Sequence, residues 1–310
     1  MQSKLKNKAT SRVFSVFLIL LLILFSWQIA RVSDGVRAAL RVCAYALIPT
    51  LFPFLVLTDL ILSLEGAERM FMTLTRPLLR PLRLSKHGGV AFFLGAFFGF
   101  PMGAKAVAHY YKLGAIQKEE AERLLLFSGN ASPFFLIGSV GLGMLSSLRV
   151  GIYLYALELF VSIFCGFLLG RTRASSHLTA SSSIPFPKEE FSVPRSVRGA
   201  VRASLFISGY VLFFSALCSV ILPFLKSPFL SRMAASFFEI ATACSLCTAS
   251  KDALTLPFCA FSVAFSGLSV FFQTQDCITE TDLSLKSYLP VKLLCGCAAF
   301  FLTALLLRFG

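Results

Sequence analysis

Long apolar runs occupy most of the sequence, and they constrain the fold more than any other feature. The runs at 13–30, 150–169, 201–225 and 288–307 are each long enough for one helix to cross a bilayer, which takes about 20 residues. Hydrophobic residues make up 56% of the 310 residues, whereas about 45–50% is usual in a soluble domain. At roughly 20 residues per span, the chain has room for about 8 to 10 membrane elements. Since backbone groups inside a bilayer must bond within their own segment, the runs predict an all-α polytopic membrane protein.

The positive charge lies mainly in the short segments between these runs. The net charge is +14, and Lys and Arg side chains gather ahead of residue 13, within 76–86 and within 171–202. Such clusters mark cytoplasmic loops, so the N-terminus is expected in the cytoplasm. Basic residues before the 13–30 run also fit a signal peptide, but the run is long and no clean A-x-A site follows it. We therefore expect an uncleaved first span, the lipid bilayer as a partner and no nucleic acid.

Motifs for catalysis or metal binding are missing from the sequence. It contains no G-x-S-x-G elbow, no H-E-x-x-H zinc motif and no phosphate-binding loop. Cys244 and Cys247 form a C-x-x-C pair, but no second pair and no suitably spaced His residues complete a metal site. The sequence therefore predicts no enzyme, no metal site and no cofactor.

Other apolar regions are interrupted, and the interruptions constrain the topology. They are 35–64 at Pro49 and Pro53, 88–113 at Gly99-Phe100-Pro101-Met102-Gly103, 119–143 at Ser-Gly-Asn-Ala-Ser-Pro, and 254–275 at Ser-Gly-Leu-Ser. A proline inside a helix removes a hydrogen bond and kinks or splits the helix. If 88–113 crossed the bilayer completely, the basic clusters at 76–86 and 171–198 would lie on opposite sides. We therefore expect 88–113 to be a re-entrant hairpin, surrounded by protein or by a water-filled cavity.

The interruptions also suggest two pseudo-repeats with re-entrant hairpins and broken helices. The expected organisation is an N-terminal span at 1–34, a first repeat at 35–170, a basic Ser/Pro-rich cytoplasmic linker at 171–199 and a second repeat at 200–310. Aligning Ile116 with Ile278 makes 254–275 the second hairpin. Broken helices at corresponding places in two halves are typical of a secondary transporter whose site lies at the repeat interface.

The break in 88–113 is the first candidate binding site. Gly99 and Gly103 permit tight backbone turning, and Pro101 cannot continue the preceding helix. The helix that restarts there offers free N–H groups and a positive dipole end, both of which suit an anion. Lys105 adds a full positive charge, although a lysine near the interface also extends simply toward water. We therefore expect a small anionic substrate.

Polar residues at the other two breaks are further candidates. Ser128, Asn130 and Ser132 interrupt 119–143, whereas Ser266, Ser269 and Gln273 follow the corresponding interruption of 254–275. Their hydroxyl and amide groups suit polar parts of a substrate or a coupling ion. The alternative is that Ser and Asn only cap helix ends.

Three acidic residues lie within apolar runs. They are Asp59, Glu158 and Glu239, the last within Phe-Phe-Glu-Ile-Ala-Thr. Carboxylates inside a membrane are expensive and often couple transport to H⁺ or Na⁺. Alternatively, each pairs with an Arg or Lys for a structural purpose.

The stretch from Gly99 to Gly143 resembles the YlbJ (SpoVV) family of sporulation integral membrane proteins, which carry nucleoside-recognition (Gate) domains. The resemblance rests on Gly99–Lys105, on Glu120–Leu124, on Asn130-Ala131-Ser132-Pro133 and on the Gly-rich segment 138–143, and it extends over roughly residues 40–307. In the second half, Phe-Phe-Glu-Ile-Ala-Thr and Phe-Ser-Gly-Leu-Ser-Val-Phe-Phe-Gln match the family pattern. One departure is Phe271-Phe272-Gln273, where family members often have His-Ala-Gln.

The resemblance implies a fold similar to concentrative nucleoside transporters. It also implies dipicolinate export from the mother cell toward the forespore, across the outer forespore membrane of a sporulating bacterium. Open alternatives are a nucleoside transporter and a non-transporting scaffold for spore morphogenesis, which would act through the linker at 174–196. A coupling ion, either H⁺ or Na⁺, and a second copy of the chain complete the partners considered.

Overall fold

The computed structural model describes residues 2–64, 66–172, 191–250 and 252–309, and all regular structure in these ranges is helical. The elements are α1 Gln2–Trp27, α2 Ile29–Val42, the π-helix η1 Cys43–Leu47, α3 Ile48–Leu62, α4 Ala67–Leu82, α5 Lys86–Phe98, α6 Met102–Lys112, α7 Lys118–Phe127, the π-helix η2 Phe134–Met144, α8 Leu148–Thr172, α9 Val193–Ile221, the 3₁₀-helix η3 Leu222–Phe224, α10 Pro228–Phe238, α11 Ile240–Ser250, α12 Thr255–Phe265, α13 Gly267–Ile278 and α14 Tyr288–Phe309. Much of the 171–199 linker lies outside the described residues.

Membrane-spanning length is reached by five helical segments among the described residues. They are Ile29–Ile61, Leu148–Arg171, Val193–Phe224, Thr255–Ile278 and Tyr288–Phe309. Large apolar side chains such as Leu205 and Phe206 are exposed on the long helices, as expected of surfaces that face lipid. The prediction of an all-α polytopic membrane protein is confirmed.

The prolines of the 35–64 region do not split it. Segments α2, η1 and α3 form one continuous apolar helix over Ile29–Ile61, with Pro49 in the first turn of α3 and Pro53 inside that helix. The π-helical turn Cys43–Leu47 directly precedes Pro49. A π-helical turn widens the helix, which relieves the clash between a proline ring and the preceding turn.

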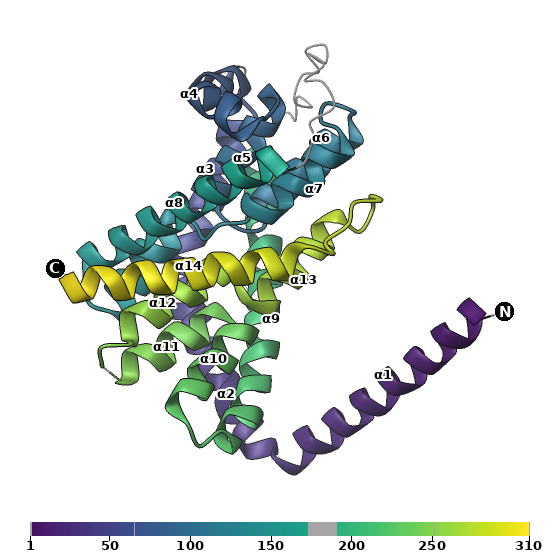
Figure 1. Cartoon of the computed structure of the whole chain (residues 1–310), viewed down its shortest axis with the longest axis vertical. Helices are drawn as coiled ribbons and strands as arrows, with labels where there is room; N and C mark the ends of the chain where they lie inside the picture. The colour runs from purple at the N-terminus through teal and green to yellow at the C-terminus, as the bar shows by residue number, and fades with distance from the viewer. Residues whose placement is uncertain (1, 65, 173–190, 251, 310) are drawn as a thin grey trace.

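Two groups of helices with the same order of elements follow, and they are called the first and second repeat below. In the first, α5 and α6 pack against each other as a hairpin, α7 and η2 form a broken helix, and α8 is a span. In the second, α10 and α11 form the hairpin, α12 and α13 the broken helix, and α14 the span. In Figure 1 the α5–α6 hairpin lies toward one end of the molecule, the α10–α11 hairpin toward the other, and α14 crosses between them.

The predicted position of the second hairpin is wrong. Helices α12 and α13 run on as a single span of 24 residues, Thr255–Ile278, so 254–275 does not reverse direction. The reversal lies at Glu239, a single extended residue with φ −156° and ψ 130° between α10 and α11. Since no Gly or Pro marks that position, the sequence pattern favoured Ser266-Gly267, where φ is positive at both residues.

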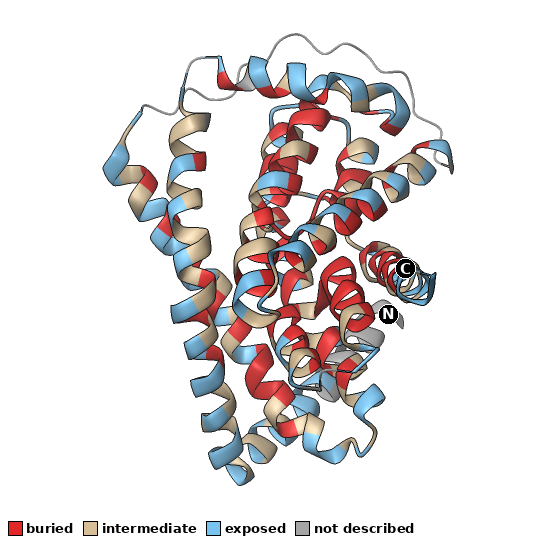
Figure 2. Cartoon of the chain, turned by 90° about the vertical axis from the view of Figure 1, so that its left-hand side faces the viewer, coloured by how far each residue is buried: buried red, intermediate tan, exposed pale blue. Residues whose placement is uncertain are grey.

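Glycines let the first hairpin pack closely on the first broken helix. A Cβ atom on Gly95 would lie 1.9 Å from the Ser128 carbonyl oxygen, and one on Gly103 would lie 2.8 Å from it. At the tip, Gly99 has φ +79°, and the Phe100 N–H donates to the Asn130 carbonyl at 3.0 Å. Figure 2 shows buried residues concentrated where these elements cross, in the interior of the molecule.

We predict that Gly95→Ala destabilises the protein by about 1–3 kcal/mol, because the new methyl group overpacks a backbone contact that cannot move aside. The measurement is the thermal unfolding midpoint of the purified chain in detergent. Gly199→Ala is the matched control, since a Cβ on this exposed residue of α9 meets nothing within 4 Å. The control should gain roughly 0.5–1 kcal/mol from helix propensity. Equal midpoints for the two variants would contradict the close packing of hairpin and break.

Candidate functional site

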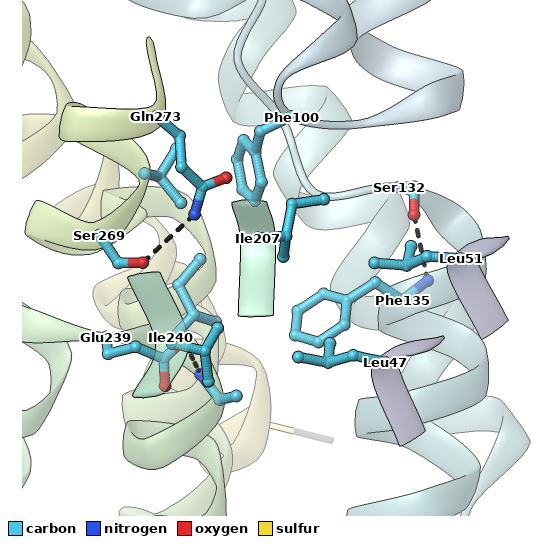
Figure 3. Close-up of a pocket in the computed structure, with 13 residues that line it drawn as sticks. Leu47, Leu51, Phe100, Ser132, Phe135, Ile207, Glu239, Ile240, Ser269 and Gln273 are labelled. Atoms are coloured by element: carbon cyan, nitrogen blue, oxygen red, sulfur yellow. Dashed lines mark hydrogen bonds between the residues drawn. The ribbon is translucent and has the colours of Figure 1, made fainter. Parts of the chain in front are cut away.

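Both hairpin tips, the first helix break and the helix that follows the second break line one pocket (Figure 3). The first repeat contributes Phe100 from its tip and Ser132 from its break. The second repeat contributes Glu239 from its tip, and Ser269 and Gln273 from the helix after its break. The rest of the wall is apolar and comes from Leu47, Leu51, Phe135, Ile207, Val211, Ile240, Ala241 and Val270. The structure therefore brings together predicted residues that lie up to 141 positions apart (273 − 132).

The pocket is small in this conformation. Its free volume is about 50 Å³, and a water molecule takes up about 30 Å³ in the liquid. Sites for organic ligands are usually about 300–1,000 Å³. One or two waters or a small ion fit this space, and an organic solute requires the hairpins to separate.

Gln273 carries the pocket's available acceptor. Its side chain is 6% exposed, and its Nε2 donates to the Ser269 hydroxyl at 3.2 Å, whereas Oε1 has no protein partner. Burying a polar atom without a partner costs about 1–3 kcal/mol. The Ser132 hydroxyl, in contrast, accepts from the Phe135 N–H at 3.2 Å and caps η2. Gln273 is therefore the side chain in the wall with an unused acceptor, ready for a donor on a solute.

Glu239 is engaged by its own hairpin. Its carboxylate accepts from the Ala241 N–H at 2.9 Å and from the Thr242 N–H at 2.6 Å. These are the first free N–H groups of α11, so the carboxylate caps that helix and meets its positive dipole end. The structural alternative considered for Glu239 is thus realised through a helix end, without a basic partner.

Two helices begin within two residues of a side chain that lines the pocket, α6 after Phe100 and α13 before Ser269. Helices α6 and α13 both begin at a break, and neither has a side-chain cap on its N-terminal N–H groups. None of the described residues that line the pocket is basic. An anion there would be held by backbone N–H groups and helix dipoles.

Lys105 lies outside the pocket. Its side chain is exposed on α6, and its charge acts on Cys277 of the adjacent α13. Gly99, Pro101 and Gly103 shape the tip and its packing and do not line the cavity. Lys105 therefore flanks the seam between α6 and α13.

The other predicted residues have partners away from the pocket, with one exception. Asn130 Nδ2 donates to the Ser162 hydroxyl at 3.1 Å, Ser266 Oγ donates to the Val263 carbonyl at 3.2 Å, and Asp59 accepts from Ser196 Oγ at 2.5 Å. The exception is Ser128, whose fully buried hydroxyl has no partner. These contacts favour structural roles for Asn130, Ser266 and Asp59.

Two buried ionisable side chains bond the break in α7–η2, and the sequence predicted a role for one of them, Glu158. Lys292 of α14 is 3% exposed, and its Nζ donates to the Gly129 carbonyl at 2.5 Å. Glu158 of α8 is also 3% exposed, and its Oε1 accepts from the Ala131 N–H at 2.8 Å. Lys292 escaped prediction because it lies near the start of an apolar run, where a lysine usually anchors a span at the interface. Among the described residues, no group of three His, Cys, Asp or Glu side chains could hold a metal ion.

Exposed ion pairs connect the two repeats at one face. Lys112 contacts Glu280 at 2.5 Å, and Lys118 contacts Asp282 at 2.6 Å. Asp282 also accepts from the Tyr111 hydroxyl at 2.7 Å. Lys118 and Tyr111 together lower the pKa of the Asp282 carboxyl, so these contacts persist at neutral pH. Exposed pairs of this kind stabilise weakly and can open readily.

The amino-acid sequence is similar to that of a known bacterial membrane protein. The chain is 27% identical over 304 residues to the sporulation integral membrane protein YlbJ of Bacillus subtilis (strain 168). The aligned region covers 83% of this chain and 73% of that protein. The similarity supports membership of the YlbJ family and confirms the resemblance seen in the motifs. No protein-family model matches the chain, and no solved structure matches it. The likeness to concentrative nucleoside transporters stays a prediction.

We predict that Glu239→Gln lowers the stability by about 1–3 kcal/mol, because an amide group cannot accept both N–H bonds and leaves one donor buried. The thermal midpoint of the purified chain measures the effect. The matched control is Glu119→Gln, since Glu119 lies in the first turn of α7 with an exposed side chain. The control should change stability by less than about 0.5 kcal/mol. A silent Glu239→Gln would show that the cap does not hold the second tip.

Proposed function

From its similarity to YlbJ, we propose that this integral membrane protein is a transporter or permease that binds a small solute between its two hairpin tips. The observation that carries the proposal is the convergence of both tips, the first break and the helix after the second break on one small pocket. Broken helices from two repeats form the substrate site in many secondary transporters, where movement of one repeat against the other gives alternating access. A pocket of about 50 Å³ then corresponds to a closed state between loading and release.

The proposed substrate is a small organic anion, with dipicolinate first because of the YlbJ resemblance. Dipicolinate is an aromatic ring with two carboxylates, and the uncapped ends of α6 and α13 offer two places for negative charge. Lys105 beside the α6–α13 seam would raise the local concentration of anions at the entrance. Because the Glu239 carboxylate already bonds the α11 N-terminus, it repels such a ligand less than a free carboxylate would.

A neutral polar solute such as a nucleoside is the second candidate. Two observations favour it: the described residues that line the pocket include no basic side chain, and Gln273 Oε1 is an unused acceptor. A nucleoside has hydroxyl and amino donors for such an acceptor, whereas a dianion has none. The two candidates would therefore use different atoms of Gln273: a nucleoside would bond the Oε1 acceptor, and a dianion would bond the Nε2 donor.

The proposed setting is the outer forespore membrane of a sporulating bacterium, with the N-terminus in the cytoplasm. The alternative of a scaffold that acts through 174–196 falls largely outside the described residues. It differs from the transporter proposal in requiring no ligand, so ligand binding separates the two.

We predict that dipicolinate raises the thermal midpoint of the purified full-length chain and that uridine does not. A ligand at 100 times its Kd stabilises the native state by about 2.7 kcal/mol, which corresponds to several degrees. Gln273→Leu should weaken the shift by changing the pocket wall, while Gln275→Leu, an exposed residue on the same helix, should keep it. A shift with uridine alone, lost in Gln273→Leu, would replace the anion with a neutral solute. If neither dipicolinate nor uridine shifts the thermal midpoint, the transporter proposal is contradicted.

We predict that Lys105→Ala slows dipicolinate uptake into proteoliposomes by about tenfold at low ionic strength and that Lys105→Arg does not, because the charge steers the anion. The difference should shrink as salt rises and screens the charge. Lys286→Ala, which removes an exposed lysine of the α13–α14 loop, is the control and should leave uptake unchanged. Equal rates for Lys105→Ala and the wild type at low salt would show that this lysine has no part in transport.

A further inference from the structure

The break in α7–η2 carries a second polar site, built from residues that do not line the pocket. Gly129 and Ala131 lie in the non-helical segment between α7 and η2, where backbone groups have lost their helical partners. Helix α14 supplies Lys292 to the Gly129 carbonyl, and helix α8 supplies Glu158 to the Ala131 N–H. A cation and an anion from two different helices therefore satisfy one helix break.

The Lys292 ammonium occupies a position suited to a free cation. Carbonyl groups released by broken helices coordinate the coupling ion in many secondary transporters. Lys292 Nζ lies 2.5 Å from such a carbonyl, that of Gly129, and the Glu158 carboxyl group bonds the N–H of Ala131, two residues further along the same break. A lysine ammonium is a compact point charge of the same sign as Na⁺. The lysine side chain thus places at this carbonyl the single positive charge that a bound monovalent metal ion would place there.

The simpler explanation is that Lys292 and Glu158 only stabilise the fold. Two buried atoms without hydrogen-bond partners argue against this explanation. Glu158 Oε2 has no hydrogen-bond partner although the residue is 3% exposed, and the fully buried Ser128 hydroxyl also has none. A pair selected only for stability would satisfy its remaining acceptors, because a buried pair stabilises only when its other polar atoms are bonded. Two buried oxygen atoms at and around the break are therefore without a bond, which a site that takes up a cation would leave available.

We propose that Lys292 is a built-in cation that fills the cation position of the α7–η2 break, with Glu158 as its counter-charge, so that the protein works without Na⁺. The proposal deepens the proposed function, because it specifies that transport through the neighbouring pocket is independent of a bound metal cation. It predicts that removal of the ammonium uncovers a site for a monovalent cation.

The test uses the purified full-length chain in detergent at fixed pH, with NaCl exchanged for choline chloride at equal ionic strength. The wild type should have the same thermal midpoint in both salts. Lys292→Ala should have a lower midpoint that rises with the logarithm of the Na⁺ or methylammonium concentration, roughly 2–4 °C for each tenfold increase above the Kd. Glu158→Gln combined with Lys292→Ala should lose this response, and Lys286→Ala should behave as the wild type.

Several outcomes would overturn the proposal. A saturable Na⁺ stabilisation of the wild type would show that a metal site exists beside the lysine. A Lys292→Ala variant that responds to neither Na⁺ nor methylammonium would show that the ammonium fills no cation position. If Lys292→Ala does not fold, Lys292→Met is compared with Glu158→Gln/Lys292→Met. The proposal requires the double variant to be the more stable, because Lys292→Met alone leaves the Glu158 charge uncompensated. Since no arm contains dipicolinate, a failure here is distinct from a failure of the proposed substrate.

Discussion

The structure depends on satisfying the peptide groups of the broken helix α7–η2 away from water. An unpaired backbone group inside a bilayer costs several kcal/mol, so irregular backbone persists there only with protein partners. The first hairpin supplies the Phe100 N–H to Asn130, α14 supplies Lys292 to Gly129, and α8 supplies Glu158 to Ala131. The close approach of Gly95 and Gly103 to the Ser128 carbonyl follows from the same requirement. Three elements are thereby placed around the pocket by one short break.

The second repeat meets the same requirement from within itself. Glu239 caps α11, the Ser236 and Ser262 hydroxyls bond at 2.6 Å between α10 and α12, and Gly267 approaches the Ser236 and Phe238 carbonyls. The first break, in contrast, needs Lys292 from α14, which belongs to the second repeat. The two repeats therefore share one order of elements, but the break of the first repeat is bonded by a side chain of the second. Any displacement of α14 from α7 has to release the Gly129 carbonyl, which couples the geometry of one repeat to the position of the other.

Local sequence patterns predicted where helices begin and end better than they predicted which helices pack against each other. Apolar runs identified three of the five membrane-length segments among the described residues, Leu148–Arg171, Val193–Phe224 and Tyr288–Phe309, whereas the run at 13–30 contains a shorter apolar helix, Phe14–Trp27. The Gly99–Gly103 break identified the first hairpin, and Ser132, Glu239, Ser269 and Gln273 do meet at the pocket. The second hairpin was misplaced because its reversal is one extended glutamate without a Gly or Pro signal. Lys292 was not predicted, and Lys105 was wrongly expected in the site. Whether a lysine side chain is buried depends on which distant helix end packs beside it, and Lys292 is buried whereas Lys105 is exposed. Such contacts between residues far apart in the sequence carry no local pattern.

The distribution of ion pairs indicates which contacts must break when the pocket opens. Within the second repeat, the Arg232 guanidinium bonds both carboxylate oxygens of Asp252, at 3.0 Å and 2.5 Å, with the arginine buried. Fork-like pairs of this geometry are strong and hold α10 to the turn before α12 as one body. The pairs of Lys112 with Glu280 and of Lys118 with Asp282 are exposed, weak and cross between the repeats. Opening at that face costs little, because water replaces those partners readily. In the proposed transport cycle, the second hairpin would therefore move as a unit with its own repeat, and the repeats would separate at the seam beside Lys105.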